Sequence, residues 1–210
     1  MTVMHLMSRS LLACIAFAGQ AMAADLDAGG PSYDWSGTYL GLTGNYSFGS
    51  ANGDTGCCAD NFSIDGLQLG ALAGYNFTFD YVLAGLEADA GMLGIDGVGF
   101  GGGVDDFDVS TMARLRARLG VPIDNLLLFV AAGLSLSTAS ANVVGSGSRS
   151  NWHLGWNAGA GVEYAMSERI ILRAEYIYDG MAAETYRYAS NTVDFEWTAS
   201  TVRLGALIKF

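Results

Sequence analysis

The sequence is poor in the residues on which most other protein classes depend. It has a single lysine, Lys209, and a net charge of -11, which excludes a nucleic-acid partner because phosphate contacts need clustered basic side chains. Charged residues make up 15% of the chain, well below the ~25% of a typical soluble domain. With only 2 prolines and 29 glycines, the composition suits long paired strands rather than a proline-rich disordered chain. After the N-terminus no apolar run approaches the ~18 residues of a membrane helix.

Long stretches of the chain alternate between apolar residues and small or polar ones. From Trp152 to Tyr164 every second residue is apolar, and the residues between them are polar or glycine. Successive side chains of a strand point to opposite faces, so this segment is predicted to be one long strand with an apolar face. After a polar break at residues 166–169 the alternation resumes from Ile170 to Tyr178. The two strands therefore form a hairpin with a tight turn.

The same alternation predicts eight strands in a single domain. They cover about residues 36–48, 64–77, 81–92, 109–121, 126–139, 151–165, 170–179 and 196–210. Trp197 falls off the phase of the last strand, which predicts a bulge or the loop margin there. Long connections alternate with short turns near residues 78–80, 122–125 and 166–169. The predicted fold is all-β, an eight-stranded antiparallel up-and-down transmembrane β-barrel with both termini on the periplasmic side.

The first 23 residues have the features of a secretory signal peptide. Arg9 supplies its basic region, Ser10 to Phe17 its apolar region, and Ala21-Met22-Ala23 a cleavage site. A lipoprotein signal ending at Cys14 is the rival interpretation, but it leaves almost no apolar segment before the cysteine. We therefore expect a signal peptide at 1–23, a periplasmic lead at 24–35 and the barrel at 36–210. The expected location is the outer membrane of a Gram-negative bacterium.

Alternation alone also fits a soluble lipocalin-type barrel, which is apolar inside and polar outside. A soluble exterior needs ~25 to 35% charged residues, whereas the polar face here is mostly Gly, Ser, Asn and Thr with clustered charges of both signs. We therefore assign the polar face to the lumen and the aliphatic face to lipid. The predicted lumen charge network consists of Glu87, Asp89, Arg114, Arg116, Arg118, Glu163, Arg173, Glu175, Asp179 and Arg203. This network either holds the lumen shut or lines a narrow, gated channel, since an eight-stranded barrel is just wide enough for its side chains.

Aromatic and acidic residues mark the two ends of the predicted barrel. Interfacial aromatics are expected near the short turns at Tyr75, Phe77 and Tyr164, and toward the long loops at Trp152, Trp156, Tyr176 and Tyr178. Outer-membrane lipids and lipopolysaccharide are the partners that this surface implies. Acidic residues of the predicted loops, Asp105, Asp106 and Asp108 among them, form either a solvated rim or a site for divalent cations shared with lipid headgroups.

The sequence does not favour an enzyme, and no cofactor or metal is expected. His153 is the single histidine after the signal peptide, and no nucleophile motif or metal-type spacing accompanies it. We interpret His153 as a hydrogen-bonding residue of the lumen or its rim.

Several motifs together resemble the small outer-membrane β-barrel proteins of alphaproteobacteria, which are similar in architecture to outer-membrane protein A. Trp35-Ser36-Gly37-Thr38-Tyr39-Leu40-Gly41 resembles the opening of that porin-like family, and Gly155 to Tyr164 with Ala174-Glu175-Tyr176 resembles a later pair of its motifs. The terminal Phe210 looks like the signal that the barrel assembly machinery reads. The resemblance implies an abundant envelope protein that is structural, porin-like, or in contact with host or ligand, with an extracellular partner possible at the loops.

The adjacent residues Cys57 and Cys58 depart from the family pattern. In an oxidising compartment they form either a vicinal or intermolecular disulfide, or they remain two thiols. The function predicted from sequence is a structural and surface-interacting envelope barrel with a plugged lumen. The alternative is a small-solute porin with a narrow or gated channel.

Overall fold

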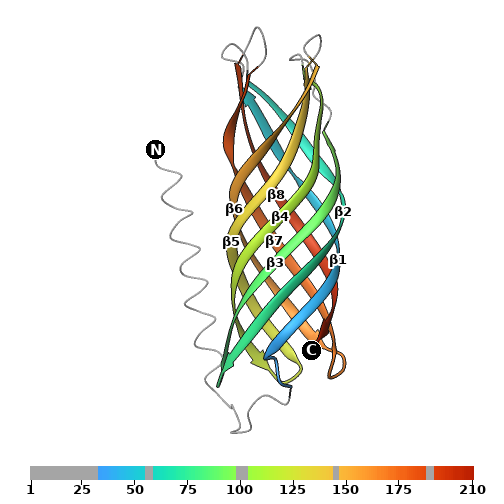
Figure 1. Ribbon diagram of the computed structural model, residues 1–210, viewed down its shortest axis with the longest axis vertical. Helices are drawn as coiled ribbons and strands as arrows, with labels where there is room; N and C mark the ends of the chain where they lie inside the picture. The colour runs from blue at the N-terminus through green and yellow to red at the C-terminus, as the bar shows by residue number, and fades with distance from the viewer. Residues whose placement is uncertain (1–32, 55–58, 98–103, 144–146, 188–191) are drawn as a thin grey trace.

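The chain forms one closed antiparallel barrel of eight strands in sequence order, with β8 pairing back onto β1. The computed structural model describes residues 33–54, 59–97, 104–143, 147–187 and 192–210 (Figure 1). The strands are β1 (Gly37–Asp54), β2 (Ala59–Phe79), β3 (Val82–Gly97), β4 (Val104–Ile123), β5 (Leu126–Val143), β6 (Gly147–Ala165), β7 (Ile170–Arg187) and β8 (Thr192–Lys209). Within those ranges no helix is long and apolar enough to cross a membrane. The predicted fold class is confirmed.

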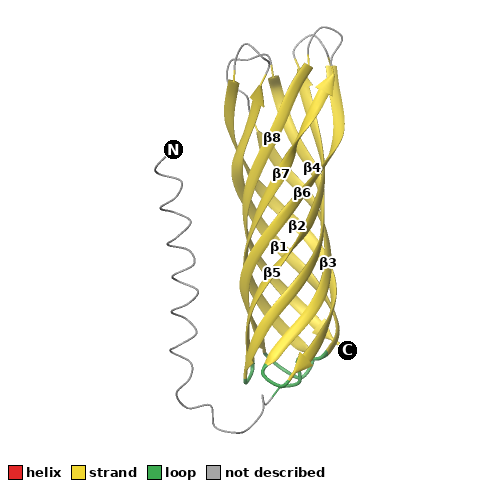
Figure 2. Cartoon of the chain, turned by 90° about the vertical axis from the view of Figure 1, so that its left-hand side faces the viewer, coloured by secondary structure: helices red, strands yellow, loops and turns green. Residues whose placement is uncertain are grey.

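Three tight turns gather at one end of the barrel, which we call the short-turn end, and the C-terminus lies there too (Figure 2). Asp80 and Asp124 open two of these turns in the left-handed region, at φ 46° and 51°. Aspartate tolerates this conformation better than most residues do. The first turn therefore begins at Asp80, slightly later than the predicted 78–80.

The strands are longer than the alternation predicted, and the loops at the opposite end are correspondingly shorter. β1 continues to Asp54 instead of ending near residue 48, and β2 begins at Ala59 instead of residue 64. Strands of 16 to 21 residues exceed the ~9 to 11 that cross a bilayer. The alternation of apolar residues stops before the strands end, and the hydrogen-bonded ladder continues beyond it. We call this continuation of the barrel, at its long-loop end, the stalk.

Trp197 corrects a second prediction. It lies inside β8 with its side chain buried in the barrel, so neither a bulge in β8 nor a loop margin is present at this residue. The irregularity lies instead on the neighbouring strand, where the β7–β8 register shifts between Met181 and Glu184. Trp197 pairs with Met181 at the edge of this shift.

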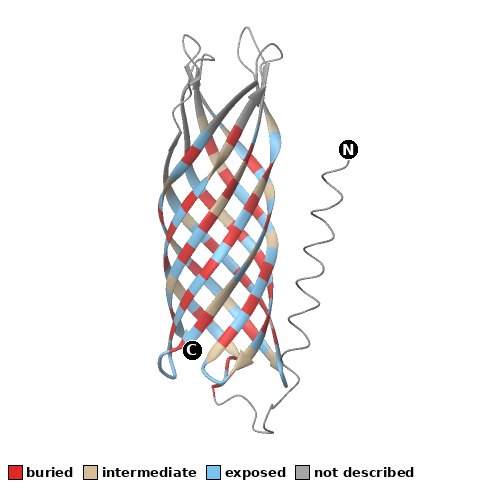
Figure 3. Cartoon of the chain, turned by 180° about the vertical axis from the view of Figure 1, so that it is seen from behind, coloured by how far each residue is buried: buried red, intermediate tan, exposed pale blue. Residues whose placement is uncertain are grey.

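Burial follows the strand alternation in all the strands wherever the structure describes it (Figure 3). The outer face is apolar and exposed, and the inner face is buried. At the short-turn end the inward side chains form an apolar cluster, the lower plug, made of Tyr33, Trp35, Tyr39, Leu72, Leu83, Leu127, Ala165, Ile171 and Leu207. The charged residues lie farther along the same inward rows.

Candidate functional site in the lumen

The ten charged residues of the predicted network all lie inside the barrel and are buried. They are Glu87 and Asp89 on β3, Arg114, Arg116 and Arg118 on β4, Glu163 on β6, Arg173, Glu175 and Asp179 on β7, and Arg203 on β8. Each occupies the inward phase of its strand. Five arginines meet five carboxylates, so the formal charges of this layer cancel (5 − 5 = 0).

Arg114 and Arg116 bridge the lumen from β4 to β7. Arg114 donates from Nε and Nη2 to the two carboxylate oxygens of Asp179, at 2.9 and 2.8 Å. Arg116 donates to Glu175 at 2.5 Å and also to Glu87, its direct register partner on β3. Bidentate arginine–carboxylate pairs are among the strongest and most directional hydrogen bonds in proteins. The contacts with Asp179 and Glu175 join β4 to β7, which are not neighbours in the wall.

A second group of contacts closes the layer toward the short-turn end. Arg173 lies 2.6 Å from Glu87 Oε2, and its Nε donates to Glu163 at 2.7 Å. Arg118 reaches the same Glu163 at 2.9 Å and donates to the hydroxyl of Tyr39 at 2.9 Å. The Tyr39 hydroxyl in turn donates to Glu87 at 2.8 Å. The two arginines therefore share Glu163, and Arg118 also lies 3.7 Å from Glu87.

Arg203 completes the network from β8. Its Nη2 lies 2.7 Å from Asp89 Oδ1, and its Nε donates to the amide oxygen of Asn45 at 3.1 Å. Asp89 also accepts a hydrogen bond from Arg114 at 3.1 Å. Every one of the five arginines has a carboxylate partner. Removing one member would leave its partner charge buried and uncompensated, which is strongly unfavourable in a low-dielectric interior.

Two aromatic rings, those of Tyr39 and Phe129, lie where the charged layer meets the lower plug. The guanidinium carbon of Arg118 lies 4.3 Å from the ring centroid of Phe129 and 5.4 Å from that of Tyr39. Arg173 lies 5.1 and 5.6 Å from the same two rings. Cations over ring faces are attracted by the ring quadrupole. Gly74 permits this arrangement, because a Cβ at that position would overlap the Tyr39 hydroxyl.

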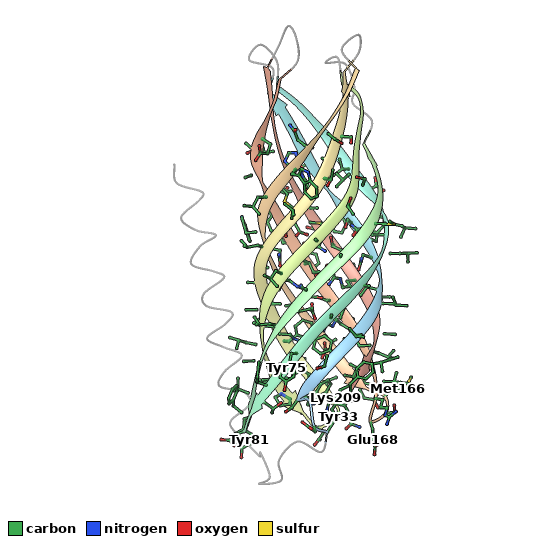
Figure 4. The ribbon with its side chains drawn as sticks, viewed as in Figure 1. Tyr33, Tyr75, Tyr81, Met166, Glu168 and Lys209 are labelled. Carbon is green, nitrogen blue, oxygen red and sulfur yellow. The ribbon has the colours of Figure 1, made fainter. Side chains whose placement is uncertain are left out.

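The residues just before β1 seal the short-turn end. The indole N–H of Trp35 donates to the carbonyl of Asp124 at 3.3 Å, and the Tyr33 hydroxyl donates to the carbonyl of Glu168 at 3.1 Å. The two rings pack edge to face, with centroids 4.7 Å apart. Figure 4 shows Tyr33, Lys209 and Glu168 together at this end.

Two titratable groups beside this seal are perturbed. Burial raises the pKa of the Tyr33 hydroxyl. The backbone N–H of Ser36, which donates to the Asp34 carboxylate at 2.9 Å, lowers the pKa of Asp34. The sequence analysis missed the sealing role of Trp35. Because Trp35 lies an even number of residues before the inward-facing Tyr39, the alternation could have predicted that Trp35 also faces inward.

Polar and then apolar side chains fill the lumen beyond the charged layer. Ser135 donates to Asp179 at 2.7 Å and accepts from Asn157 at 2.9 Å. Farther toward the long-loop end the buried inward residues include Ile64, Val109, Met112, Ala139, Met181 and Trp197. His153 lies on the inward face of β6 beside Ser137 and is also completely buried.

The predicted interfacial aromatics lie on the outer wall. Tyr75, Phe77 and Tyr164 are exposed near the short-turn end, where Figure 4 labels Tyr75. On the other half of the wall the exposed aromatics include Trp152, Trp156, Tyr176 and Tyr178. The terminal Phe210 is exposed, and its backbone N–H donates to the carbonyl of Thr38 at 2.9 Å.

Some predicted features lie outside the described residues. These are the signal peptide at 1–23, most of the lead at 24–35, and the pair Cys57 and Cys58. The side chains of Asp105, Asp106 and Asp108 also lie outside the part of the structure that is described.

A closed antiparallel wall with an apolar exterior and a charged interior defines the class of membrane β-barrels. A model of the family "Outer membrane protein beta-barrel domain" matches residues 10–210. The 25 kDa outer-membrane immunogenic protein of Brucella canis is 31% identical over 184 residues, covering 86% of this chain and 81% of that protein. The 22 kDa outer membrane protein of Rhizobium leguminosarum bv. viciae is 29% identical over 180 residues, covering 86% and 80%.

Among solved structures, the outer membrane protein OprG of Pseudomonas aeruginosa matches with a TM-score of 0.57 at 13% identity, covering 86% of this chain and 99% of that one. This likeness shows the fold. The chain belongs to the outer-membrane β-barrel family and has alphaproteobacterial relatives. It is an outer-membrane protein of the Gram-negative envelope, as the sequence predicted. Short turns of such barrels face the periplasm, so the stalk faces outward.

Proposed function

We propose that this protein is a structural barrel of the outer membrane that does not conduct solutes and that contacts its surroundings through its outward end. Three kinds of packing in the lumen support this proposal. The lower plug fills the periplasmic end, the neutral ion-pair layer fills the middle, and buried apolar side chains lie beyond it. A solute crossing the barrel would have to displace each of them.

The observation that carries the proposal is the set of arginines that reach across the lumen. Arg114 and Arg116 start on β4 and end on carboxylates of β7, so their side chains occupy the cross-section through which a solute would move. Charged side chains that line an open channel instead stay at the wall and leave the axis to water and ions. Opening this lumen would require at least two buried ion pairs to separate.

A small-solute porin is the alternative function. The density of ionisable side chains supports it, because rings of charge also select ions in channels. In that case, the arginines would have to swing aside in a gated state.

Conductance in planar bilayers separates the two functions. The purified barrel should give no steady current steps. The Arg116→Glu variant tests the alternative, because a pore lined by this residue would change its preference between anions and cations. Arg169→Glu, in the exposed turn between β6 and β7, is the matched control. Steady wild-type conductance with a selectivity that follows Arg116 would refute the closed lumen.

We also propose that the barrel is not an enzyme. The sequence supports this, since it carries no G-x-S-x-G motif and no metal-type histidine spacing. The relatives are named for their outer-membrane location and immunogenicity.

For partners, we propose three contacts. Outer-membrane lipids and lipopolysaccharide surround the wall, the barrel assembly machinery reads the C-terminal Phe210, and an extracellular partner meets the loops. The first rests on the exposed apolar exterior and the second on the exposed terminal aromatic ring.

A further inference from the structure

The outer wall carries an apolar groove that runs across β8, β1, β2 and β3. Its volume is about 880 Å³, which lies within the ~300 to 1,000 Å³ range of small-molecule sites. The residues that line it include Gly44, Tyr46, Leu69, Met92, Val202 and Leu204. The groove lies on the outside of the barrel and is therefore separate from the charged lumen.

Gly44 creates this groove. The outward row of β1 places long side chains on either side of it, at Leu42 and Tyr46, and its register partners are Leu69 on β2 and Leu204 on β8. A Cβ added at Gly44 would meet no heavy atom within 4 Å. One missing side chain among four large neighbours leaves a depression in an otherwise convex wall.

The groove lies in the outer half of the membrane. With a rise of about 3.3 Å per residue and a tilt of about 40°, each residue of β1 climbs about 2.5 Å along the barrel axis. Gly44 follows Gly37 by seven positions (44 − 37 = 7), so it lies about 18 Å above the start of the strand, within an apolar band about 25 Å tall. Tyr46 and Phe48 then mark the outer edge of this band, where aromatic residues belong.

A hydrogen-bond acceptor lies beside Tyr46, at the outer end of the groove. The Tyr46 hydroxyl donates to the Asp65 carboxylate at 3.2 Å, and Asp65 itself is exposed on the outer face of β2. A carboxylate accepts hydrogen bonds and repels phosphate. A lipid that fits here should have an apolar chain and, next to it, a neutral hydroxyl or amide donor.

We propose that this groove binds one acyl chain of lipopolysaccharide, with Asp65 accepting a hydrogen bond from the hydroxyl or amide at the head of that chain. Lipopolysaccharide occupies the outer leaflet, and its amide-linked, hydroxylated chains carry donors where Asp65 lies. Glycerophospholipids place ester groups at that depth, and these only accept hydrogen bonds. A second barrel is also a poor occupant, because two rigid convex walls meet at their ridges and leave a narrow depression unfilled. The inference specifies a site for the lipid contact proposed above and is independent of whether the lumen conducts.

Native mass spectrometry of the purified barrel tests this site. Wild-type protein mixed with lipopolysaccharide in mild detergent should retain one molecule per barrel. Gly44→Leu places a side chain in the groove, and its Cβ meets no heavy atom within 4 Å. The variant should weaken retention about tenfold or more, because several buried methylene contacts are lost. Ala158→Leu, on the exposed face of β6, is the matched control and should bind as the wild type does. Asp65→Asn, which keeps the shape but loses the charge, should weaken retention by a smaller factor.

Three results would overturn the site. These are retention of lipopolysaccharide by Gly44→Leu as strong as that by Ala158→Leu, equal retention of a mixture of phosphatidylethanolamine and phosphatidylglycerol, and the joining of two barrels by a cross-linker attached at position 44. Heat-modifiable mobility on gels verifies that each variant is folded. The bilayer recordings report on the lumen separately, so failure of the groove and failure of the closed barrel give different results.

Discussion

Tyr39 and Glu87 are joined by a hydrogen bond of 2.8 Å, although 48 residues separate them in the chain. They lie on β1 and β3, and the strand between them contributes Gly74, whose lack of a side chain lets the tyrosine reach across. The same hydroxyl accepts a hydrogen bond from Arg118. Tyr39 thus links the lower plug, of which its ring is a member, to the charged layer through its hydroxyl.

Tyr39→Phe should lower the free energy of unfolding by about 1 to 3 kcal/mol, because Glu87 and Arg118 each lose a buried partner while the ring stays. Urea unfolding in lipid vesicles, followed by tryptophan fluorescence, measures the change. Tyr164→Phe on the exposed wall should leave the midpoint unaltered. Equal stability of the two variants would show that the hydroxyl contributes nothing.

Gly74→Ala should destabilise the barrel by about 1 to 3 kcal/mol, since the new methyl group must displace the Tyr39 hydroxyl or the backbone of β2. Gly44→Ala is the control, because it adds the same methyl group to a strand position with open space. The two free energies of unfolding, compared under the same conditions, should differ by at least about 1 kcal/mol. Indistinguishable values would contradict the close approach of Tyr39 to β2.

Arg116→Met should cost about 3 to 5 kcal/mol, because Glu87 and Glu175 would each lose a buried partner. Arg169→Met, in the exposed turn, should change stability by less than about 0.5 kcal/mol. Adding Glu175→Gln to Arg116→Met should recover part of the loss, since one uncompensated charge is then removed. If the double variant is less stable than Arg116→Met, the two residues do not act as a pair.

Trp35→Ala should cost about 3 to 5 kcal/mol, because it empties the centre of the lower plug and removes the hydrogen bond to Asp124. Amides of neighbouring residues at the short-turn end should exchange with solvent faster than in the wild type. Trp152→Ala, which removes an exposed indole from the outer wall, should leave those exchange rates unchanged. Unchanged exchange in both variants would show that the end is sealed without Trp35.

The hydrogen bond from the Ser36 backbone N–H to the Asp34 carboxylate should weaken in acid. The pKa of Asp34 is lowered from 3.8, chiefly by the backbone N–H of Ser36, so the contact stabilises the fold above the unfolded pKa. That contribution is lost as the pH falls through the lower, folded pKa. The amide resonance of Ser36 should titrate with a midpoint below 3.8 and should stop titrating in Asp34→Asn. A midpoint at or above 3.8 would contradict the hydrogen bond.

The alternation of side chains predicted which charges face inward, because phase along a strand depends only on local geometry. The alternation does not predict which of these charges pair with each other, as Arg114 and Asp179 show. They are 65 residues apart on strands that do not touch, and their pairing depends on how the closed wall staggers its strands. No local pattern encodes that stagger.

The ends of the strands are a second feature that the sequence pattern does not predict. Residues 49–54 lack apolar alternation and were predicted to be loop, yet they complete the ladder with β2 and β8. Trp35 was placed in the lead because the strand pattern begins after it, and its burial depends on the positive φ of Gly37 at 118°, which turns the chain into the barrel mouth.

Pairing of β1 with β8 has a consequence for how the protein is made. The first strand to leave the ribosome finds its last neighbour only after the whole chain has been synthesised, since β8 ends at Lys209. Until then both edges of the sheet stay open, and an open edge attracts other chains. Export must therefore deliver a soluble, unclosed polypeptide to the membrane, and any truncation before the final residues should leave a sheet that aggregates instead of inserting.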